Sequence, residues 1–266
     1  MMRVSILASG SNGNATIIET EQESFLIDDG LSFKNLYSRI NFCENKIEKM
    51  SSIFITHEHS DHVAGLKVLL KRVPLKCYLS KGTFEGLDFE TKIQVENTGY
   101  SFIKSKDIVE MKDCKITAIG THHDANEPLG FIIEENDKKL VYITDTGYVD
   151  QVYFPILENA DMYILESNYD VELLWSSSRP FLTKKRIDGD YGHMSNVASA
   201  VLLSKLIGSK TKKVVFAHIS DDCNYYGMQS LILNEHKKIY EEIGVDFKHV
   251  EFHFGNRFGV TGVFEI

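Results

Sequence analysis

The sequence predicts an α/β fold in which metal-binding side chains follow buried strands. Residues 52–55, Ser-Ile-Phe-Ile, form a short β-branched and aromatic run that is typical of a buried strand. Residues 63–70 place apolar side chains at the spacing of a helix with one apolar face. Between them, residues 56–62 read Thr-His-Glu-His-Ser-Asp-His. Because sites in open α/β sheets form at the carboxyl ends of strands, we expect a functional site at this turn.

Four side chains that can bind a metal through nitrogen or oxygen fall within this turn. His57 and His59 are two positions apart and can point the same way from an extended segment, so both can reach one metal. Asp61 and His62 follow as the chain turns into the helix, and they suit a second metal. A polar turn with chance histidines is the alternative, but three of the chain's 10 histidines lie here. The sequence therefore predicts a dinuclear metal site.

The pattern His57-x-His59-x-Asp61-His62 resembles the signature of the metallo-β-lactamase superfamily. This resemblance implies a four-layer αββα sandwich with two metals at one end of the sheets. It also implies three further ligands along the chain, namely a histidine, a bridging aspartate and a final histidine.

Length and composition favour a single domain over residues 1–266. The 266 residues can form one large α/β domain or two small ones, and the chain shows no repeat, low-complexity segment or flexible linker. No apolar run approaches the roughly 18 to 20 residues that span a bilayer, and the N-terminal apolar segment is too short for a secretory signal. The 4 cysteines are widely spaced, which suits a reducing compartment. We therefore expect a cytoplasmic protein that binds no membrane.

The net charge of −9 argues against loose binding along nucleic acid, which needs many lysine and arginine contacts to phosphate. It does not exclude a phosphodiester substrate at one locally cationic site, because two divalent metals add positive charge. The sequence does not indicate an obligate protein partner.

The opening of the chain is expected to form three strands, at residues 4–8, 15–20 and 24–28. The loop at residues 9–14 is either a hairpin turn or a nest of backbone N–H groups and small side chains near an anionic substrate. Its candidate substrate contacts are Ser11, Asn12 and Asn14. With Ile-Asp-Asp-Gly at 27–30, the loop resembles the start of the YycJ (WalJ)-like branch of the superfamily. The resemblance implies that Asp28 supports the site without binding a metal.

Two later strands each end in a candidate ligand. Residues 115–119 lead into His122 and His123. In the YycJ-like pattern the ligand precedes Asp-Ala, which assigns His123, although a register shift of one residue would exchange the two. Residues 140–144 lead into Asp145. A lone aspartate after a strand is more often a helix cap or turn former, but with two metals implied we favour a bridging carboxylate.

Residues 179–186 are the only dense basic stretch. They form either a solvated surface loop or a loop that faces an anionic substrate. The stretch leads to residues 192–197, where Ser195 or Asn196 could cap a helix that extends to Ile207. The candidate substrate contacts in this part of the chain are Asn168, which lies in a segment that also matches the YycJ-like branch, and Arg179, Lys185, Arg186 and Ser195.

Elsewhere, the pattern predicts helices at 33–42, 81–89 and 226–243, and strands at 76–79, 108–111, 130–135, 162–165, 214–217, 248–252 and 260–266. His218 follows one of these strands. His236 lies on the exposed pattern of the last helix, and His249 and His253 lie near no other ligand type, so we interpret all three as structural.

The resemblance implies a complete ligand set. One metal would be held by His57, His59 and His123. The other would be held by Asp61, His62 and His218, with Asp145 bridging both. Such ligands suit Zn(II), Mn(II) or Fe(II), and ligand type alone does not choose among them. Two such ions can lower the pKa of a shared water towards neutrality, which predicts hydrolysis by metal-bound hydroxide that Asp61 helps to orient.

Three functions fit these residues. The resemblance implies a phosphodiesterase that degrades DNA as a 5′→3′ exonuclease, and the basic stretch agrees with this. The alternative is a small-molecule hydrolase acting on a thioester, lactone, β-lactam or cyclic phosphodiester. The third is a metal-dependent sensor, which the ligand set disfavours because structural sites tend to be closed and mononuclear.

His193 is not needed as a metal ligand. It is either a solvent-facing side chain at the start of a helix or a catalytic group. As a catalytic group it would bind a phosphate oxygen or protonate the leaving alkoxide.

Overall fold

The computed structural model describes residues 1–225, 227 and 229–266. The chain divides into two compact units. Unit 1 consists of residues 1–120, 125–138 and 256–266, and unit 2 consists of residues 121–124 and 139–255. The described strands form two seven-stranded sheets, of which the first lies wholly in unit 1. The expected single domain over residues 1–266 stays a prediction.

The first sheet combines an antiparallel part with a parallel part. Its strand order is β14-β1-β2-β3-β4-β5-β6. The pairs from β14 to β3 are antiparallel, and the pairs from β3 to β6 are parallel. The strands are β1 (Arg3–Ala8), β2 (Ala15–Glu19), β3 (Ser24–Ile27), β4 (Ser52–Phe54), β5 (Lys76–Leu79), β6 (Tyr100–Phe102) and β14 (Gly262–Glu265). The carboxyl end of β4 leads into the turn at 56–62, which is called the metal-binding turn because it carries four of the predicted metal ligands.

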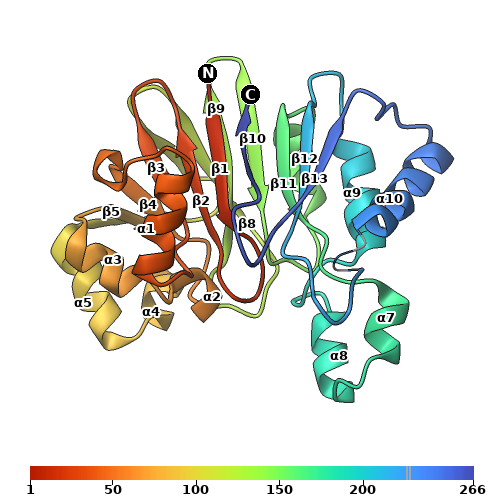
Figure 1. Cartoon of the computed structure of the whole chain (residues 1–266), viewed down its shortest axis with the longest axis horizontal. Helices are drawn as coiled ribbons and strands as arrows, with labels where there is room; N and C mark the ends of the chain where they lie inside the picture. The colour runs from red at the N-terminus through yellow and green to blue at the C-terminus, as the bar shows by residue number, and fades with distance from the viewer. Residues whose placement is uncertain (226, 228) are drawn as a thin grey trace. The chain divides into compact units, whose positions relative to one another are not determined.

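The helices of unit 1 pack on this sheet through a common core. Leu26 and Ile53 from the strands lie in one buried cluster with Leu36, Leu69 and Val95 from the helices. Burying each such side chain stabilises the fold by about 1.5–3 kcal/mol. Figure 1 shows α1, α3 and α5 along the sheet. The helical segments are α1 (Phe33–Phe42), η1 (Ile47–Lys49), α2 (Ser60–Val63), α3 (Leu66–Arg72), α4 (Lys81–Gly86) and α5 (Phe89–Thr98).

The helix expected after the metal-binding turn is interrupted at Gly65, which lies between α2 and α3. A Cβ atom at Gly65 would lie 2.0 Å from the carbonyl oxygen of Leu31. The N–H of Gly65 also donates to the carbonyl of Asp29 at 2.9 Å. Only glycine permits this close backbone approach, which fixes the metal-binding turn against the segment that leaves β3.

The second sheet has strands in both units. Unit 1 contributes an antiparallel set, β7 (Ile108–Glu110), β8 (Lys115–Gly120) and β9 (Leu129–Glu135). Unit 2 contributes a parallel set, β10 (Lys138–Ile143), β11 (Met162–Glu166), β12 (Lys213–Ala217) and β13 (Glu251–Phe254). The parallel strands end at the same edge. Asp145, Glu166 and His218 therefore come together where β10, β11 and β12 end.

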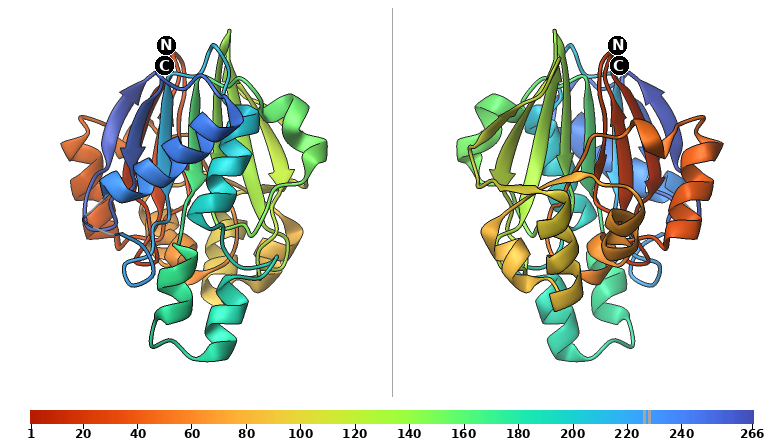
Figure 2. Two further views of the ribbon diagram at one scale, coloured as in Figure 1. Left: turned by 90° about the vertical axis from the view of Figure 1, so that its right-hand side faces the viewer. Right: turned by 90° about the vertical axis from the view of Figure 1, so that its left-hand side faces the viewer.

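The helices of unit 2 include two that lie side by side. Figure 2 shows α9 and α10 together over the strands of this unit. The helical segments are η2 (Gln151–Tyr153), α6 (Phe154–Leu157), α7 (Val171–Ser176), α8 (Phe181–Ile187), α9 (Asn196–Leu206) and α10 (Gln229–Ile243). The expected start of the last helix at Tyr226 lies outside the described residues. Within the described part of the chain, no helix is both long enough and apolar enough to cross a bilayer.

The basic stretch at 179–186 is largely helical, so the expectation of a loop is wrong. Helix α8 begins after Pro180, whose fixed φ suits the first turn of a helix. None of the residues of α8 is buried, so the sequence has no apolar face that would indicate the helix. The preceding helix, α7, begins at Asp170, whose side chain accepts a hydrogen bond from the N–H of Leu173 at 2.8 Å.

Asp29 is a fully buried carboxyl group next to the turn that carries the metal-binding residues. Burial raises the pKa of Asp29 to about 8, although a backbone hydrogen bond from Leu31 opposes the shift. The folded chain therefore holds a proton that the unfolded chain releases at lower pH. Stability consequently falls as pH rises from the unfolded pKa to the folded pKa.

We expect Asp29→Asn to remove this pH dependence, because the amide is neutral at every pH and has nearly the same shape. The gain in the free energy of unfolding of the variant over the native chain should be larger at about pH 8 than at about pH 5. Urea unfolding followed by circular dichroism measures both values. A difference that is constant between these pH values would contradict the buried, protonated Asp29.

Candidate metal centre

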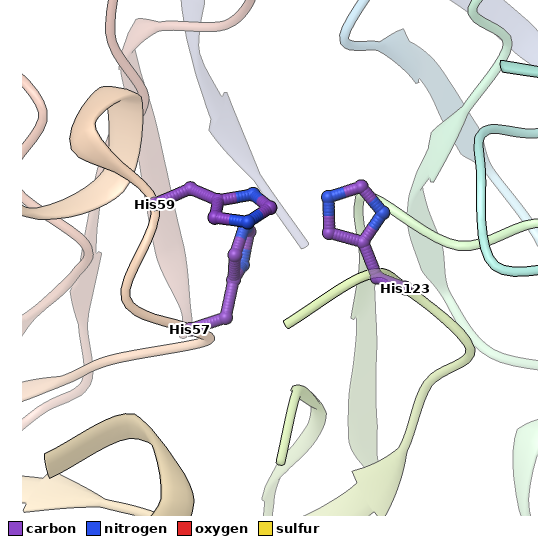
Figure 3. A group of neighbouring side chains, drawn as sticks. All are labelled: His57, His59 and His123. Atoms are coloured by element: carbon purple, nitrogen blue, oxygen red, sulfur yellow. The ribbon is translucent and has the colours of Figure 1, made fainter. Parts of the chain in front are cut away.

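The loop after β4 presents His57, His59, Asp61 and His62. His59 stands at the N-cap of α2, and its backbone is extended at φ −62° and ψ 148°. The rings of His57 and His59 have centroids 4.7 Å apart, and His57 lies 4.1 Å from His62. Figure 3 shows His57 and His59 leaving the same loop. The extended segment therefore turns both imidazoles to the same side, as the spacing predicts.

Asp28 and Thr56 hold His62 in a buried network. The Nδ1 of His62 lies 2.8 Å from Oδ2 of Asp28, and neither side chain is exposed. Asp28 also accepts hydrogen bonds from the N–H and the hydroxyl of Thr56, both at 2.8 Å. Donation from Nδ1 leaves the lone pair of Nε2 to act as a ligand, which is the usual support of a metal-binding histidine. Asp28 therefore acts through His62.

Burial is the largest influence on the Asp28 carboxyl, and it raises the pKa of Asp28 despite the opposing bonds from His62 and Thr56. Asp28 also adopts a positive φ of 60°. Non-glycine residues rarely adopt this conformation, and they persist at functional sites where surrounding contacts over-determine it. The network around His62 supplies such contacts.

The loop at residues 9–14 is tied to the metal-binding turn by Asn14. Asn14 is buried, and its N–H donates to the carbonyl of Asp61 at 2.7 Å. Its amide lies 3.0 Å from Nε2 of His62 and 3.4 Å from Oδ2 of Asp61. Ser11 and Asn12 are exposed. Their contact with substrate, like that of Asn14, stays a prediction, and Asn14 in this structure contacts the two predicted metal ligands Asp61 and His62.

Unit 2 gathers four possible ligands at the ends of β10, β11 and β12. Asp145, Glu166, His193 and His218 each offer one ligand atom, and these atoms all lie within 4.8 Å of one another. Asp145 and His218 both adopt positive φ, at 51° and 52°. The Nδ1 of His218 lies 3.3 Å from Oδ1 of Asp145. The two unusual backbone conformations thus bring together side chains that follow β10 and β12, the strands on either side of β11.

Glu166 is the residue of this cluster that the sequence analysis did not assign. Its Oε1 atom lies 2.8 Å from Nδ1 of His193 and 3.0 Å from Nδ1 of His218. Its Oε2 atom accepts from the N–H groups of Thr146 and Met194 at 2.9 and 3.1 Å. The available signal was its position as a charged residue that ends a buried strand, in the same way as Asp145 follows one.

The environment of Glu166 favours its charged form. Burial alone would raise the pKa of Glu166, but His193 and His218 outweigh it, and the pKa lies below its ordinary value. The carboxylate therefore accepts from both Nδ1 atoms and sets both rings in the same tautomer. The Nε2 atoms of His193 and His218 are left to bind a metal or a substrate.

His123 lies close to this cluster, and its neighbour faces elsewhere. The Nε2 atom of His123 lies 3.9 Å from Oδ1 of Asp145, and its Nδ1 donates to the carbonyl of Gly192 at 2.9 Å. Burial lowers the pKa of His123, which favours the neutral ring that a metal requires. His123 is also labelled in Figure 3, on the loop after β8.

His122 makes a different set of contacts. It pairs with Asp150 at 3.0 Å and stacks on Tyr148, with the ring centroids 3.9 Å apart. Within unit 2, the structure therefore places His123 next to the predicted ligand Asp145 and directs His122 to another group of residues. The assignment of His123 as a metal ligand stays a prediction.

The candidate basic contacts are mostly paired within the protein. Arg179 bonds to Asp222 at 3.1 Å. Arg186 bonds to Asp124, which raises the pKa of Arg186. Lys185 is exposed. Of the three cations, Lys185 is thus the one whose charge the described residues leave most available to a substrate.

Asn168 and Ser195 serve the framework of the cluster. The amide of Asn168 donates to the carbonyl of His218 at 2.6 Å, and Ser195 caps α9 by accepting from Ala198 at 3.2 Å. Both side chains are largely buried. Their predicted contact with a substrate stays a prediction.

Of the histidines interpreted as structural, His236 is buried, contrary to the expected exposed position. Its ring lies against that of Phe216, with centroids 4.2 Å apart and planes tilted by 46°, and burial lowers the pKa of His236 to about 4. The sequence pattern misassigned its face because α10 turns this side chain towards Phe216 of β12. His249 is exposed and His253 is partly exposed, and both pair with nearby carboxylates, at 3.8 Å to Asp246 and 3.6 Å to Glu251.

The donor chemistry fits divalent metals. Unit 1 presents three imidazoles and a carboxylate on one turn, and unit 2 presents imidazoles and carboxylates at neighbouring strand ends. Such nitrogen and oxygen donors suit first-row divalent ions. The buried partners of His62, His193 and His218 are of the kind that orient metal-binding histidines.

We expect Glu166→Gln to destabilise unit 2, because the amide cannot accept from two imidazoles while also accepting from two N–H groups. The free energy of unfolding should fall by roughly 1–3 kcal/mol in a urea titration. Glu241→Gln, which neutralises an exposed carboxylate on α10, is the matched control and should change stability little. Equal effects of the two substitutions would count against the orienting role of Glu166.

Comparison with known proteins identifies a family and close relatives. The family described as "Beta-lactamase superfamily domain" matches residues 24–219. The chain is 35% identical over 248 residues to Exodeoxyribonuclease WalJ of Streptococcus pneumoniae, covering 92% of each protein. It is also 35% identical over 266 residues to Exodeoxyribonuclease YycJ of Bacillus anthracis, covering 100% of this chain and 94% of that protein.

Solved structures share the fold at low sequence identity. The metallo-β-lactamase fold protein YhfI of Bacillus subtilis superposes with a TM-score of 0.70 at 16% identity, with all of both chains covered. Zn²⁺-bound PqqB of Methylobacterium extorquens gives 0.67 at 14% identity, also over all of both chains. These likenesses confirm the predicted fold class, the α/β four-layer αββα sandwich.

Proposed function

The chain belongs to the metallo-β-lactamase superfamily, and from this premise we propose that it is a metal-dependent DNA exonuclease acting in the 5′→3′ direction. The observation that carries the proposal is the full-length likeness to two exodeoxyribonucleases, together with a set of metal-binding side chains at the strand ends. The substrate class is therefore a nucleic acid with phosphodiester bonds.

Two divalent cations, Zn(II) or Mn(II) with Fe(II) as a further candidate, complete the proposed site. One would be held by His57, His59 and His123. The other would be held by Asp61, His62 and His218, with Asp145 shared. When bound, such cations supply Lewis-acid activation of water and of the phosphodiester.

The protein's own groups prepare this chemistry. Asp28 fixes the ring of His62 through Nδ1, and Glu166 does the same for His218. This pre-orders the ligands, so that little reorganisation is needed when substrate binds. Asp61 lies beside His62, with 3.6 Å between Oδ2 and Nε2, so its carboxylate would be placed to orient the attacking water.

His193 is the proposed proton donor. Its Nδ1 is engaged by Glu166, so the opposite ring nitrogen is directed away from the carboxylate. The side chain remains partly exposed, in contrast with the buried His123 and His218. A protonated ring beside a carboxylate can donate to the oxygen that leaves the phosphorus, which is a poor leaving group without protonation.

A nuclease assay tests the proposed activity. We expect 5′-labelled DNA, supplied single- or double-stranded with Mn(II) or Zn(II), to lose its label as short products at the earliest times. Asp61→Ala should lower this rate by roughly 100-fold while the protein stays folded. Asp246→Ala, at an exposed aspartate of unit 2, is the control.

The same assay can reject the proposal. RNA of the same sequence, a thioester and a lactone are tested beside DNA. Turnover of a small ester with intact DNA under both metals would favour the small-molecule hydrolase. Near-native activity of Asp61→Ala on every substrate would remove Asp61 from the mechanism.

His193→Ala tests the proton donor. The variant should lose activity on DNA by roughly 10²–10⁴-fold, because the alkoxide leaves unprotonated. It should lose less on bis(p-nitrophenyl) phosphate, whose leaving group needs little protonation. Equal losses would indicate phosphate binding by His193, and no loss on either substrate would return it to a structural position at the start of α9.

A further inference from the structure

A groove lies along α9 in unit 2, apart from the proposed metal ligands. Its volume is about 640 Å³, within the range of sites that hold small organic ligands. The lining is mainly apolar and includes Tyr148, Phe154, Val197, Val201 and Leu202, with Lys205 among the polar members. Tyr148, Val197 and Val201 are each more than a third exposed, so this apolar lining is open to solvent.

The loops that line the groove also carry Asp145 and His193 of the candidate metal-binding cluster. Gly147 and Tyr148 follow Asp145 after β10, and Met194 and Ser195 follow His193. From Ser195 at its N-cap, α9 runs for about 15 Å to Lys205 in its last turn. A ligand bound along this helix would therefore have one end next to His193 and the other next to Lys205.

Tyr148 forms a rigid aromatic wall of the groove. The ring of His122 stacks on one face at 3.9 Å and 11°, and His122 is itself fixed by Asp150 at 3.0 Å. The hydroxyl of Thr146 donates to the carbonyl of Tyr148 at 2.6 Å, which fixes the backbone beneath the ring. Nucleobases stack on aromatic side chains irrespective of their sequence, so a fixed ring of this kind suits a base.

Lys205 supplies the charge for the other half of a nucleotide. It is exposed, and its ammonium group lies 5.6 Å from the ring centroid of Phe154, at the edge of the apolar lining. An apolar trough that contains one cation matches a ligand with an apolar, flat part and an anionic part. An uncharged apolar ligand would offer no anionic group to the ammonium of Lys205.

We propose that the groove along α9 binds one nucleotide of the DNA substrate, with its base against Tyr148 and the apolar face of α9 and a phosphate at Lys205. This subsite rests on the proposed nuclease function. It binds the DNA strand next to the cluster that contains His193, through contacts that do not depend on the base sequence.

Isothermal titration calorimetry with thymidine 5′-monophosphate tests the subsite. We expect Lys205→Gln to weaken binding about fivefold, as expected for one exposed ion pair. Val201→Trp fills the groove and should weaken binding more than about tenfold. Lys238→Gln, the same change at an exposed lysine of α10, should bind as the native chain does. Thymidine should bind more weakly than the nucleotide, and circular dichroism checks that each variant is folded.

Several outcomes would overturn the subsite. These are native binding by both groove variants, no binding of the nucleotide by the native chain, or binding of thymidine that equals that of the nucleotide and ignores Lys205. On DNA, Val201→Trp should raise KM more than it does on bis(p-nitrophenyl) phosphate, and an unchanged KM for DNA would also reject the subsite. If the nucleotide binds as expected but the native chain cleaves no DNA, the groove stands and the proposed function alone fails.

Discussion

The candidate site depends on buried carboxylates that hold imidazole rings through Nδ1. Asp28 does this for His62, and Glu166 does it for His193 and His218. A buried carboxylate is costly unless it is paired, and a buried imidazole can adopt either tautomer unless a partner selects one. Each pairing solves both problems, because the carboxylate gains a donor and the ring is left with Nε2 available. Removing either carboxylate would leave the Nδ1 atoms of its histidines without their charged acceptor.

This arrangement requires unusual backbone conformations. Asp28, Asp145 and His218 all have φ between 51° and 60°, and each directly follows a strand or lies within two residues of its end. The left-handed conformation reverses the chain at once, so that a side chain immediately after a strand faces the neighbouring strand's end. Aspartate and histidine tolerate this region better than most residues, yet it remains strained. The sheets supply the rigid support that keeps the strained residues in place.

The sequence was most informative where chemistry and strand ends coincide. The cluster from His57 to His62 could be predicted because several ligand types follow one apolar run. The bridging role of Asp145 was inferred from the two metals already implied, and the choice of His123 over His122 required the family pattern. Glu166 was missed because one acidic residue at the end of a strand carries no motif. The helix α8 was missed because none of its side chains is buried, and the burial of His236 was missed because helical periodicity does not show that this side chain packs against Phe216 of β12. Tertiary packing decided the case of His236.

The central claim is that the seven predicted ligands hold two divalent cations and share Asp145. Elemental analysis of chain purified without chelator, followed by titration with Mn(II) or Zn(II), tests it most directly. The native chain should bind two equivalents, and Asp145→Asn should lose affinity at both sites with the fold retained. A single equivalent that added metal cannot raise, or an Asp145→Asn variant that binds two cations as tightly as the native chain, would contradict it.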